Sequence, residues 1–395
     1  MESVYYPLVF VHGLFGWGEG SGLEKNYHYW GFGGADRDLA AHLREAGCEV
    51  YAPSNGPVSG AWDRACELWA ILCGGTVDYG AAHAKRYGHA RFGRTYPGLL
   101  PDWGEPGKHE KIHLLAHSFG GAVARLFSSL AAYGDGTERA ATPEGDLSPL
   151  FAGGHGGRIL SVTTFSGVNN GTTFADFWGN TGMRLIAGTV YGANALAGET
   201  PLMRLYDFDS DQWGVMSDPF SKKGERLSLP AKFRRVRDYN RNGVDHIGHE
   251  MQLPVMALMN SKMRLDPETY YFACRACRTH ETKRGNQLPN RNMRKILKVW
   301  STMMGRYRPA KLLPFGFDES WLPSDGIVNV RGLSAPLDQP FEDYPADEAL
   351  RPGIWYNLPV EDKHHMSWVG IGEDPAVFFA YYEALCSRLK RLEPQ

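Results

Sequence analysis

The sequence predicts an α/β protein whose mostly parallel central sheet is covered by helices on both faces. Two observations predict this class: short apolar runs rich in strand-forming residues alternate along the chain with segments of helical periodicity, and turn residues separate them. Strands that alternate with helices usually pair in parallel and have both faces covered. With 395 residues, 43% of them hydrophobic, the chain can bury a large core. We expect a single domain over residues 1–395.

The individual elements follow from local pattern. Strands are expected where a run of apolar or β-branched residues is bounded by turn residues, at 7–11, 48–51, 112–116, 158–165, 269–273 and 354–358. Helices are expected where apolar residues recur at helical spacing, at 36–46, 62–72, 122–127 and from 375 onward. Asp374 and Pro375 open the last helix, because Asp is a good N-cap and Pro suits the first helical position.

A long insertion, residues 166–267, separates two of the predicted strands. A structureless loop of that length is implausible, so the segment should carry helices. Its first part, 174–205, is apolar and interrupted by glycines. These residues either extend the core or form a cap over a binding site. We favour a cap, because the insertion begins beside the strand ends where α/β sheets bind ligands.

Ser118 lies between the predicted strand 112–116 and the predicted helix 122–127. It is flanked by Ala116 and Gly120, two small residues. A serine at a sharp strand–turn–helix junction is the nucleophile elbow of the α/β-hydrolase fold, where small neighbours allow strand and helix to pack closely. The pattern is common by chance, and its position between strand and helix gives it weight. It predicts Ser118 as a nucleophile.

A serine nucleophile needs a base and an acid that orients the base, and in this fold the order is serine, acid, histidine. Asp325 precedes a glycine, a pair that is usually no more than a turn. His364 and His365 stand near the C-terminus, where the base is expected, and their adjacency leaves the choice open from the residues alone. The developing oxyanion needs two backbone N–H donors. We assign these to Phe119, after the nucleophile, and to Leu14, in the glycine-rich loop after the first strand.

Composition excludes several classes of function. The formal net charge is -2, so no basic excess points to nucleic acid. No apolar run is long enough to span a membrane. The six cysteines are too sparse for a disulfide scaffold, and the single CxxC formed by Cys274 and Cys277 lacks the second pair of a metal site. The glycine-rich loop that holds Leu14 also lacks the spacings of a phosphate-binding loop.

Several segments resemble the thermoalkalophilic, zinc-containing bacterial lipases of Geobacillus type and their staphylococcal relatives. The most specific matches are Trp-Asp-Arg-Ala-Cys-Glu at 62–67, Gly-Gly-Thr-Val-Asp-Tyr-Gly at 74–80, Gly-His-Ala-Arg-Phe-Gly-Arg at 88–94 and Asp-Gly-Ile-Val-Asn at 325–329. The resemblance covers most of the chain. It implies an α/β-hydrolase in which Ser118 is the nucleophile, Asp325 the acid and His365 the base, with Leu14 and Phe119 as oxyanion donors.

The resemblance also implies a structural zinc ion in an extra region beside the cap. Its ligands would be Asp63, His83, His89 and a carboxylate after the cap, which we assign to Glu250. Asp245 and His249 are rival candidates for that fourth position. Two imidazoles and two carboxylates suit a four-coordinate zinc site.

A calcium site near the catalytic histidine of such lipases matches this chain poorly. Ser367 stands where the relatives have an acidic residue, and Asp374 is accounted for as an N-cap. Relatives of this type are secreted, which implies an extracellular protein. The N-terminal residues carry no leader-like segment, so a cytoplasmic location is expected if Met1 is the native start.

The sequence therefore predicts a serine carboxylic-ester hydrolase, a triacylglycerol lipase that meets its lipid or ester substrate at a lipid–water interface. An esterase or acyltransferase that uses shorter or soluble acyl donors would share every catalytic residue. A zinc-binding module that has lost catalysis is an alternative of another class.

Overall fold

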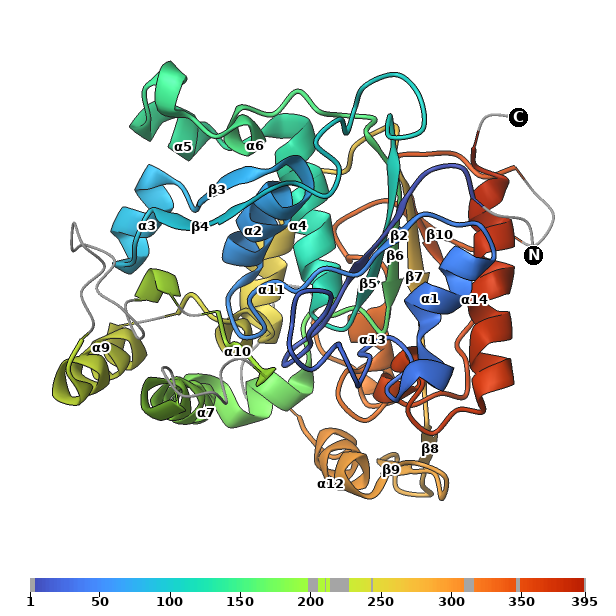
Figure 1. The fold of residues 1–395 in the computed structure, drawn as a ribbon. Coiled ribbons are helices and arrows are strands. Elements are labelled where there is room, and N and C mark those ends of the chain that lie inside the picture. The colour runs from blue at the N-terminus through green and yellow to red at the C-terminus, as the bar shows by residue number, and fades with distance from the viewer. Residues whose placement is uncertain are drawn as a thin grey trace.

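A computed structural model gives the fold of the chain (Figure 1). The residues it describes are 4–197, 205–209, 211–213, 227–242, 244–308, 316–345 and 349–393. Within this part of the chain, no helix is both long enough and apolar enough to cross a membrane.

Seven parallel strands form the central sheet, in the order β10-β11-β7-β6-β5-β1-β2. The predicted α/β fold with a parallel sheet is confirmed. The short strand β10 escaped prediction because all three of its residues are exposed, so it lacks an apolar run. The strands are β1 (Leu8–Val11), β2 (Val50–Tyr51), β5 (Ile112–His117), β6 (Ile159–Phe165), β7 (Tyr270–Cys274), β10 (Phe341–Asp343) and β11 (Trp355–Asn357).

Helices cover both faces of this sheet (Figure 1). On one side lie α1 (Leu39–Glu45) and α14 (Pro375–Lys390). On the other side lie α2 (Ala61–Cys73), α4 (Gly120–Tyr133) and α11 (Leu253–Asn260). The strands β1, β5 and β6 are buried along their whole length, so the main hydrophobic core forms between the sheet and these two helical layers.

A small subdomain packs beyond α2. It consists of the antiparallel strands β3 (Gly75–Asp78) and β4 (Phe92–Tyr96), with α3 (Ala81–Tyr87) in the connection between them. Two further helices, α5 (Gly136–Ala141) and α6 (Pro149–Ala152), lie next to it. The predicted extra region is therefore a folded unit on the α2 side of the sheet.

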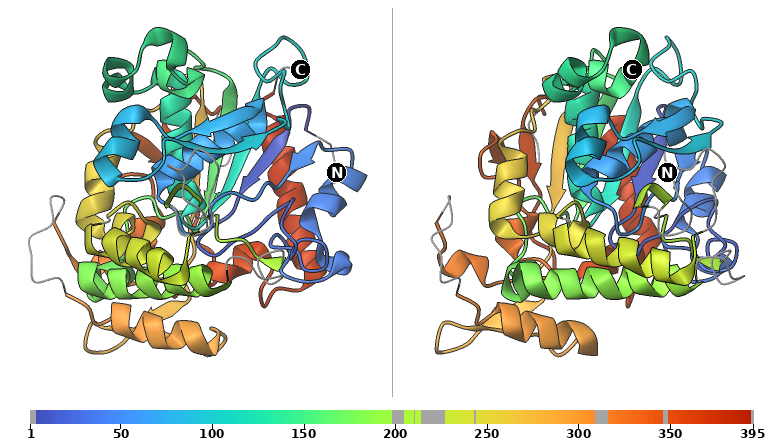
Figure 2. Two further views of the ribbon diagram at one scale, coloured as in Figure 1. Left: turned by 60° about the vertical axis from the view of Figure 1, so that its left-hand side comes forward. Right: turned by 90° about the vertical axis from the view of Figure 1, so that its left-hand side faces the viewer.

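Helices also cover one end of the sheet, as a cap would. Helix α7 (Thr173–Ala197) is broken at Gly179, which has φ +57°, and α9 (Leu229–Asn242) runs beside it (Figure 2). Helix α10 (Ile247–Glu250) follows. The predicted helical segment 174–205 thus corresponds to α7, and its residues 198–204 lie outside the described residues.

A second structure at the same end lies outside the predicted insertion 166–267. It consists of the hairpin β8 (Thr279–Glu281) and β9 (Gln287–Pro289), followed by α12 (Lys295–Met304). The remaining short elements are α13 (Val330–Leu333) and the 3-10 turns Ala35–Arg37, Glu144–Asp146, Asp211–Trp213, Glu319–Trp321 and His365–Val369.

Candidate active site and candidate metal centre

Ser118 stands at the carboxyl end of β5, directly before α4. Its φ is +58°, a left-handed backbone conformation that few non-glycine residues adopt and that strained functional turns use. Close packing explains the small neighbours: a Cβ on Gly120 would lie 2.4 Å from the carbonyl oxygen of Val11, and one on Gly13 would lie 2.7 Å from the Ser118 Cβ. Sheet, loop and helix therefore meet around this serine.

Ser118, His365 and Asp325 form one hydrogen-bonded chain. The Ser118 Oγ lies 2.8 Å from His365 Nε2, and His365 Nδ1 lies 2.7 Å from Asp325 Oδ2. The structure thus brings together three residues that are up to 247 positions apart. The neighbouring His364 does not join them, and its Nδ1 lies 3.2 Å from Ser367 Oγ.

The surroundings of Asp325 keep its carboxylate charged. Burial raises the pKa of this carboxyl group. The charge and hydrogen bond of His365, together with hydrogen bonds from two backbone N–H groups, outweigh burial, so the pKa of Asp325 is lowered. The N–H groups of Ile327 and Val328 donate to Asp325 Oδ1 over 2.9 and 2.8 Å. The Asp-Gly turn visible in the sequence therefore also orients the carboxylate toward the imidazole.

The backbone N–H groups of Leu14 and Phe119 lie in the two loops that flank Ser118. Among the described residues, neither donates a hydrogen bond to a protein acceptor. The peptide unit that carries the Leu14 N–H is fixed, because its Gly13 carbonyl accepts from Gly16 over 3.1 Å. These two donors are thus left for a ligand, as an oxyanion site requires.

A chain of buried hydrogen bonds links the loop of Leu14 to the loop of His365. His117 Nε2 donates to the His365 carbonyl over 2.9 Å, since a carbonyl can only accept. Burial and the nearby His365 lower the pKa of His117 to about 3, so its Nδ1 keeps a lone pair that accepts from the Tyr29 hydroxyl over 2.7 Å. The Tyr29 oxygen accepts in turn from the Gly13 N–H over 3.1 Å. Sequence analysis missed this network.

An apolar cavity of about 550 Å³ opens onto Ser118. Helix α7 contributes Met183, Ile186 and Val190 to its wall, which supports a cap at this position. Helix α12 adds Leu297 and Trp300, so the cover extends beyond the predicted insertion. The polar groups in the wall are few: Ser118, Tyr29, His117, His246 and His365.

A second buried cluster, of Asp63, His83, His89 and Asp245, lies where the small subdomain meets the cap. One ligand atom from each residue falls within 4.8 Å of all the others. His83 Nε2 lies 3.2 Å from Asp63 Oδ1 and 3.0 Å from Asp245 Oδ2. Oxygen and nitrogen ligands about 2 Å from a tetrahedral ion are about 3.3 Å apart, so this spacing suits zinc.

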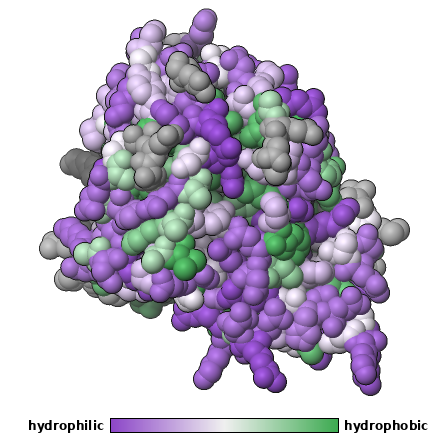
Figure 3. Space-filling view, turned by 90° about the vertical axis from the view of Figure 1, so that its right-hand side faces the viewer, coloured by the Kyte–Doolittle hydropathy of each residue, from purple (hydrophilic) through white to green (hydrophobic). Residues whose placement is uncertain are grey.

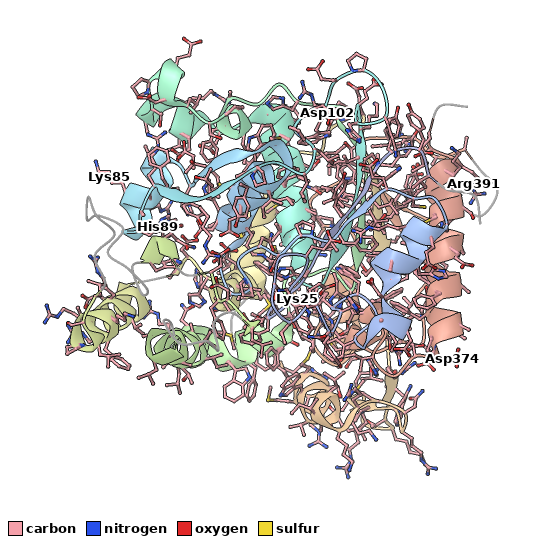
Figure 4. The ribbon with its side chains drawn as sticks, viewed as in Figure 1. Lys25, Lys85, His89, Asp102, Asp374 and Arg391 are labelled. Carbon is pink, nitrogen blue, oxygen red and sulfur yellow. The ribbon has the colours of Figure 1, made fainter. Side chains whose placement is uncertain are left out.

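The donor atoms of the cluster also have the right chemistry for a cation. His89 Nδ1 donates to the Ala90 carbonyl over 2.8 Å, which leaves the Nε2 lone pair directed toward the carboxylates. His89 Nε2 is buried with no hydrogen-bond partner among the described residues, and Asp63 Oδ1 faces only the His83 ring nitrogen, 3.2 Å away. Such atoms are costly unless a ligand completes them, and a divalent metal ion would do so. His89 lies at the left of the molecule, below Lys85 (Figure 4).

The structure corrects the expected fourth ligand: Asp245 joins the cluster and Glu250 does not. Glu250 Oε2 accepts a hydrogen bond from the Ala61 N–H over 2.7 Å. This carboxyl group caps the N-terminus of α2, where Gly60 has no side chain to do so. Burial and the neighbouring Asp245 raise the pKa of Glu250 to about 8. The other rival, His249, bonds to Asn180 instead, with its Nδ1 2.9 Å from the Asn180 Oδ1.

The loop after His365 is tied down by an arginine. Arg37 donates to the carbonyls of Gly370 and Glu373 over 2.8 and 2.9 Å, and to that of Gly31 over 3.0 Å. Asp374 caps α14 by accepting from Ala376 over 2.9 Å. Here a guanidinium holds the backbone, and nothing in the sequence around residue 37 signalled that role.

Comparison with known proteins places this geometry in a family. The sequence model of the family described as "Lipase-like, C-terminal domain" matches residues 4–380. The chain belongs to this family. A curated family relative, "Lipase 2" of Staphylococcus aureus, is 31% identical over 370 residues, which are 93% of this chain and 50% of the relative. The chain thus spans about half the length of the curated relatives it matches.

Solved structures of lipases and esterases share the fold along nearly the whole chain. The lipase of Staphylococcus hyicus has a TM-score of 0.85 at 29% identity, and the match covers 98% of this chain and 96% of that one. EstA of Clostridium botulinum has a TM-score of 0.81 at 34% identity, with 99% and 88% covered. The expected resemblance to staphylococcal lipases is confirmed.

Proposed function

We propose that the chain is a serine carboxylic-ester hydrolase that cleaves triacylglycerol or similar long-chain esters. The chain of short contacts from Ser118 through His365 to Asp325, at the floor of an apolar cavity, carries this proposal. Membership of a lipase-like family supports it. A cavity lined almost entirely by apolar groups favours a long acyl chain over a short one.

Each residue has a defined step in the reaction. Ser118 Oγ attacks the ester carbonyl carbon while its proton passes to His365 Nε2. The carbonyl oxygen becomes an oxyanion and accepts hydrogen bonds from the Leu14 and Phe119 N–H groups. Collapse expels the alcohol, which takes the proton from His365 Nε2 and leaves Ser118 acylated.

The second half of the reaction repeats these roles with water. Water gives a proton to His365 Nε2 and attacks the acyl carbonyl, and the acid is released as Ser118 Oγ regains the proton. Asp325 stays ionised throughout and holds the imidazole with Nδ1 protonated. The four ligands of the metal cluster leave no position for substrate, so a bound zinc ion would be structural.

The test is covalent labelling combined with a substrate profile. A serine-reactive phosphonate should label the intact protein at Ser118, and a folded Ser118→Ala variant should stay unlabelled. Hydrolysis rates should rise with acyl-chain length on emulsified esters. Labelling at another residue would refute the assigned nucleophile, and a chain without labelling would be the non-catalytic binding module.

An esterase that prefers short or soluble acyl donors is the second candidate, and similarity to EstA of Clostridium botulinum favours it. The cap distinguishes the two functions. We propose that α7 and its neighbours move to admit a lipid surface, so activity should increase when substrate passes from monomers to an emulsion. A flat response across that boundary would favour the esterase.

A further inference from the structure

One stretch of the chain, residues 282–308, has a charge balance unlike that of the rest. It contains eight Lys and Arg residues and no Asp or Glu, in a chain whose formal net charge is -2. The stretch includes β9 and α12. We call its Lys and Arg side chains the basic platform. Two acidic residues lie nearby, Glu281 in β8 and Glu319 close to the hairpin turn at Gly285, so the local balance stays strongly positive.

The charges of the basic platform face solvent. Seven of the eight side chains are exposed and the eighth, Lys298, is half-buried. None forms an ion pair with a residue in the described part of the chain. The Lys298 ammonium donates to the Arg291 carbonyl over 2.8 Å, so even this cation is not neutralised. Uncompensated like charges repel each other and favour an anionic partner.

The basic platform lies at the lower end of the molecule in Figure 1, where α12 and the β8–β9 hairpin project from the body. Long side chains with nitrogen at their tips extend downward from both elements (Figure 4). The side view shows hydrophilic side chains projecting from the same end (Figure 3). The charges are therefore concentrated on one protruding surface.

Exposed apolar residues lie among these charges. Ile296 is 55% exposed and Val299 is 63% exposed, although both lie on α12 with Lys295 and close to its N-cap residue Arg294. On α7, which packs beside α12 through Phe174 and Trp300, Leu185 is 71% exposed. Single apolar side chains are common on any protein surface, and it is their combination with a dense set of cations on one helix that is typical of a helix at a membrane surface.

The position of the cavity shows what such a surface would achieve. Ile296, Leu297 and Trp300 of α12 line the cavity that leads to Ser118, so the same helix carries cations outside and pocket wall inside. A surface that binds α12 would bring its molecules against a helix that forms part of the cavity wall. A soluble polyanion, such as a nucleic acid, would use the cations but not the exposed Ile296 and Val299.

We propose that the basic platform docks the protein on an anionic lipid surface, with α12 in contact with the headgroups. The inference rests on the proposed function for what docking achieves, namely delivery of ester to Ser118. Docking itself depends on charge and apolar contact, and it can be measured without catalysis. Cations near an anionic bilayer each strengthen binding by about fivefold at physiological ionic strength, where the field extends about 8 Å.

The test measures binding of the full Ser118→Ala chain to vesicles of phosphatidylcholine alone and of phosphatidylcholine with phosphatidylglycerol. We expect much tighter binding to the anionic vesicles. The double variant Arg294→Gln/Lys295→Gln should weaken that binding about 25-fold, from two cations at about fivefold each. Its matched control is Lys85→Gln/Arg391→Gln, which removes the same charge from two exposed residues far from α12 (Figure 4).

Two further measurements separate a lipid surface from other polyanions. Raising the ionic strength to about 1 M shortens screening to about 3 Å and should abolish the preference for phosphatidylglycerol. Val299→Ser should weaken binding to both kinds of vesicle, because it removes an apolar contact. Sulfated dextran should compete weakly with the anionic vesicles.

Equal binding to both vesicles, or equal losses in the double variant and its control, would overturn the proposal. Dextran binding as tight as vesicle binding, together with no effect of Val299→Ser, would assign the surface to a soluble polyanion instead. These outcomes are independent of catalysis. Failure of the proposed hydrolysis would show in the labelling of Ser118, which the vesicle measurements do not use.

Discussion

The Ser118 centre consists of Ser118, His365 and Asp325, and the metal cluster consists of Asp63, His83, His89 and Asp245. The two sites are built alike but differ in how many of their polar atoms have a hydrogen-bond partner within the protein. Both are buried, and both join residues from distant parts of the chain. At the Ser118 centre, both Asp325 oxygens accept hydrogen bonds and both His365 nitrogens have partners. In the metal cluster, His89 Nε2 has no hydrogen-bond partner among the described residues, and Asp63 Oδ1 has only the His83 ring nitrogen near it.

This difference indicates that the Ser118 centre is preorganised, whereas the metal cluster depends on a ligand. A site whose polar groups satisfy one another keeps its geometry without substrate, as a catalytic centre must. A site with buried polar atoms that lack partners and with two adjacent carboxylates depends on positive charge, which protonated His83 supplies in part and a bound metal ion would supply in full. Variants at the first site should therefore change turnover at constant stability, and variants at the second should change stability at nearly constant turnover.

The largest effect is expected for Ser118→Ala. Removing the nucleophile of such a triad lowers kcat by about 10⁶-fold and leaves the binding groups in place. The melting temperature should stay within a few degrees of the parent protein, because only a hydroxyl is lost. Ester hydrolysis and thermal unfolding measured on the same preparation check both halves. A folded variant with substantial activity would remove the basis of the proposed function.

The two adjacent histidines give the next largest effect. His365→Ala should lower kcat by at least about 10⁴-fold, since it removes the base and the hydrogen bond to Asp325 Oδ2. His364→Ala should change kcat far less, because its imidazole bonds to Ser367 and does not reach Ser118. The ratio of the two turnover numbers is the measurement. A greater loss at His364 would mean that the base is misassigned.

At the metal cluster, Asp245→Ala should abolish zinc binding and lower stability by about 4 kcal/mol when free zinc is about a thousandfold above its Kd. Elemental analysis should find about one zinc per chain in the parent and none in the variant. Turnover at low temperature should persist. The matched control is Glu250→Gln, which keeps an acceptor for the Ala61 N–H and should retain the metal. Loss of zinc from Glu250→Gln alone would restore Glu250 as the ligand.

Most of the fold and the Ser118 centre could be predicted because their signals are local. The continuous apolar run at 112–116 and the small residues around Ser118 mark the elbow within a dozen positions. The role of Asp325 and the choice of His365 over His364 came from family resemblance, since an Asp-Gly turn and a histidine pair carry little information alone.

The fourth residue of the metal cluster could not be predicted, because two carboxylates compete for two positions. One caps the N-terminus of α2 and the other joins the cluster. Asp245 and Glu250 stand five residues apart, and both are buried near Asp63. Only the backbone geometry places Asp245 in the candidate metal cluster and Glu250 on the Ala61 N–H. The hydrogen bond from Arg37 to the Gly370 carbonyl could not be predicted either, because every residue has a backbone carbonyl and the sequence does not show which one accepts.

The metal cluster should also differ from the Ser118 centre in the pH dependence of its contribution to stability. In the metal-free protein, burial lowers the pKa of His83. Asp245 and Asp63 outweigh burial and raise this pKa from 6.5 to about 10. The resulting stabilisation is complete below pH 6.5 and is lost as the pH rises through about 10. Zinc needs neutral His83 and His89, and Asp63 and Asp245 also outweigh burial in raising the pKa of His89, so zinc binding should release at least about one proton at neutral pH. Calorimetry in buffers of different ionisation enthalpy measures this release, and a value near zero would contradict it.

The smallest effect is expected for Tyr29→Phe, which breaks the link between the Gly13 N–H and His117. Loss of an oxyanion donor costs about 10²–10³ in kcat, so disturbing the loop that carries the Leu14 donor should cost about tenfold, with little change in KM. The matched control is Tyr271→Phe. That hydroxyl is also buried and also accepts from a backbone N–H, of Asp266 over 2.9 Å, but far from Ser118. Equal changes in kcat for both variants would leave Tyr29 with no special role.

The sheet order has a consequence for the timing of activity. Ser118 follows β5, an interior strand of the sheet, whereas His365 follows β11, which is second from one edge and pairs with β7. During synthesis Ser118 emerges long before His365, so under the proposed mechanism a growing chain would carry an inert serine until β11 and α14 dock. Contacts of such long sequence separation form late in folding. Recovery of esterase turnover after dilution from denaturant would therefore report the docking of the last strand, later than any signal from the central strands.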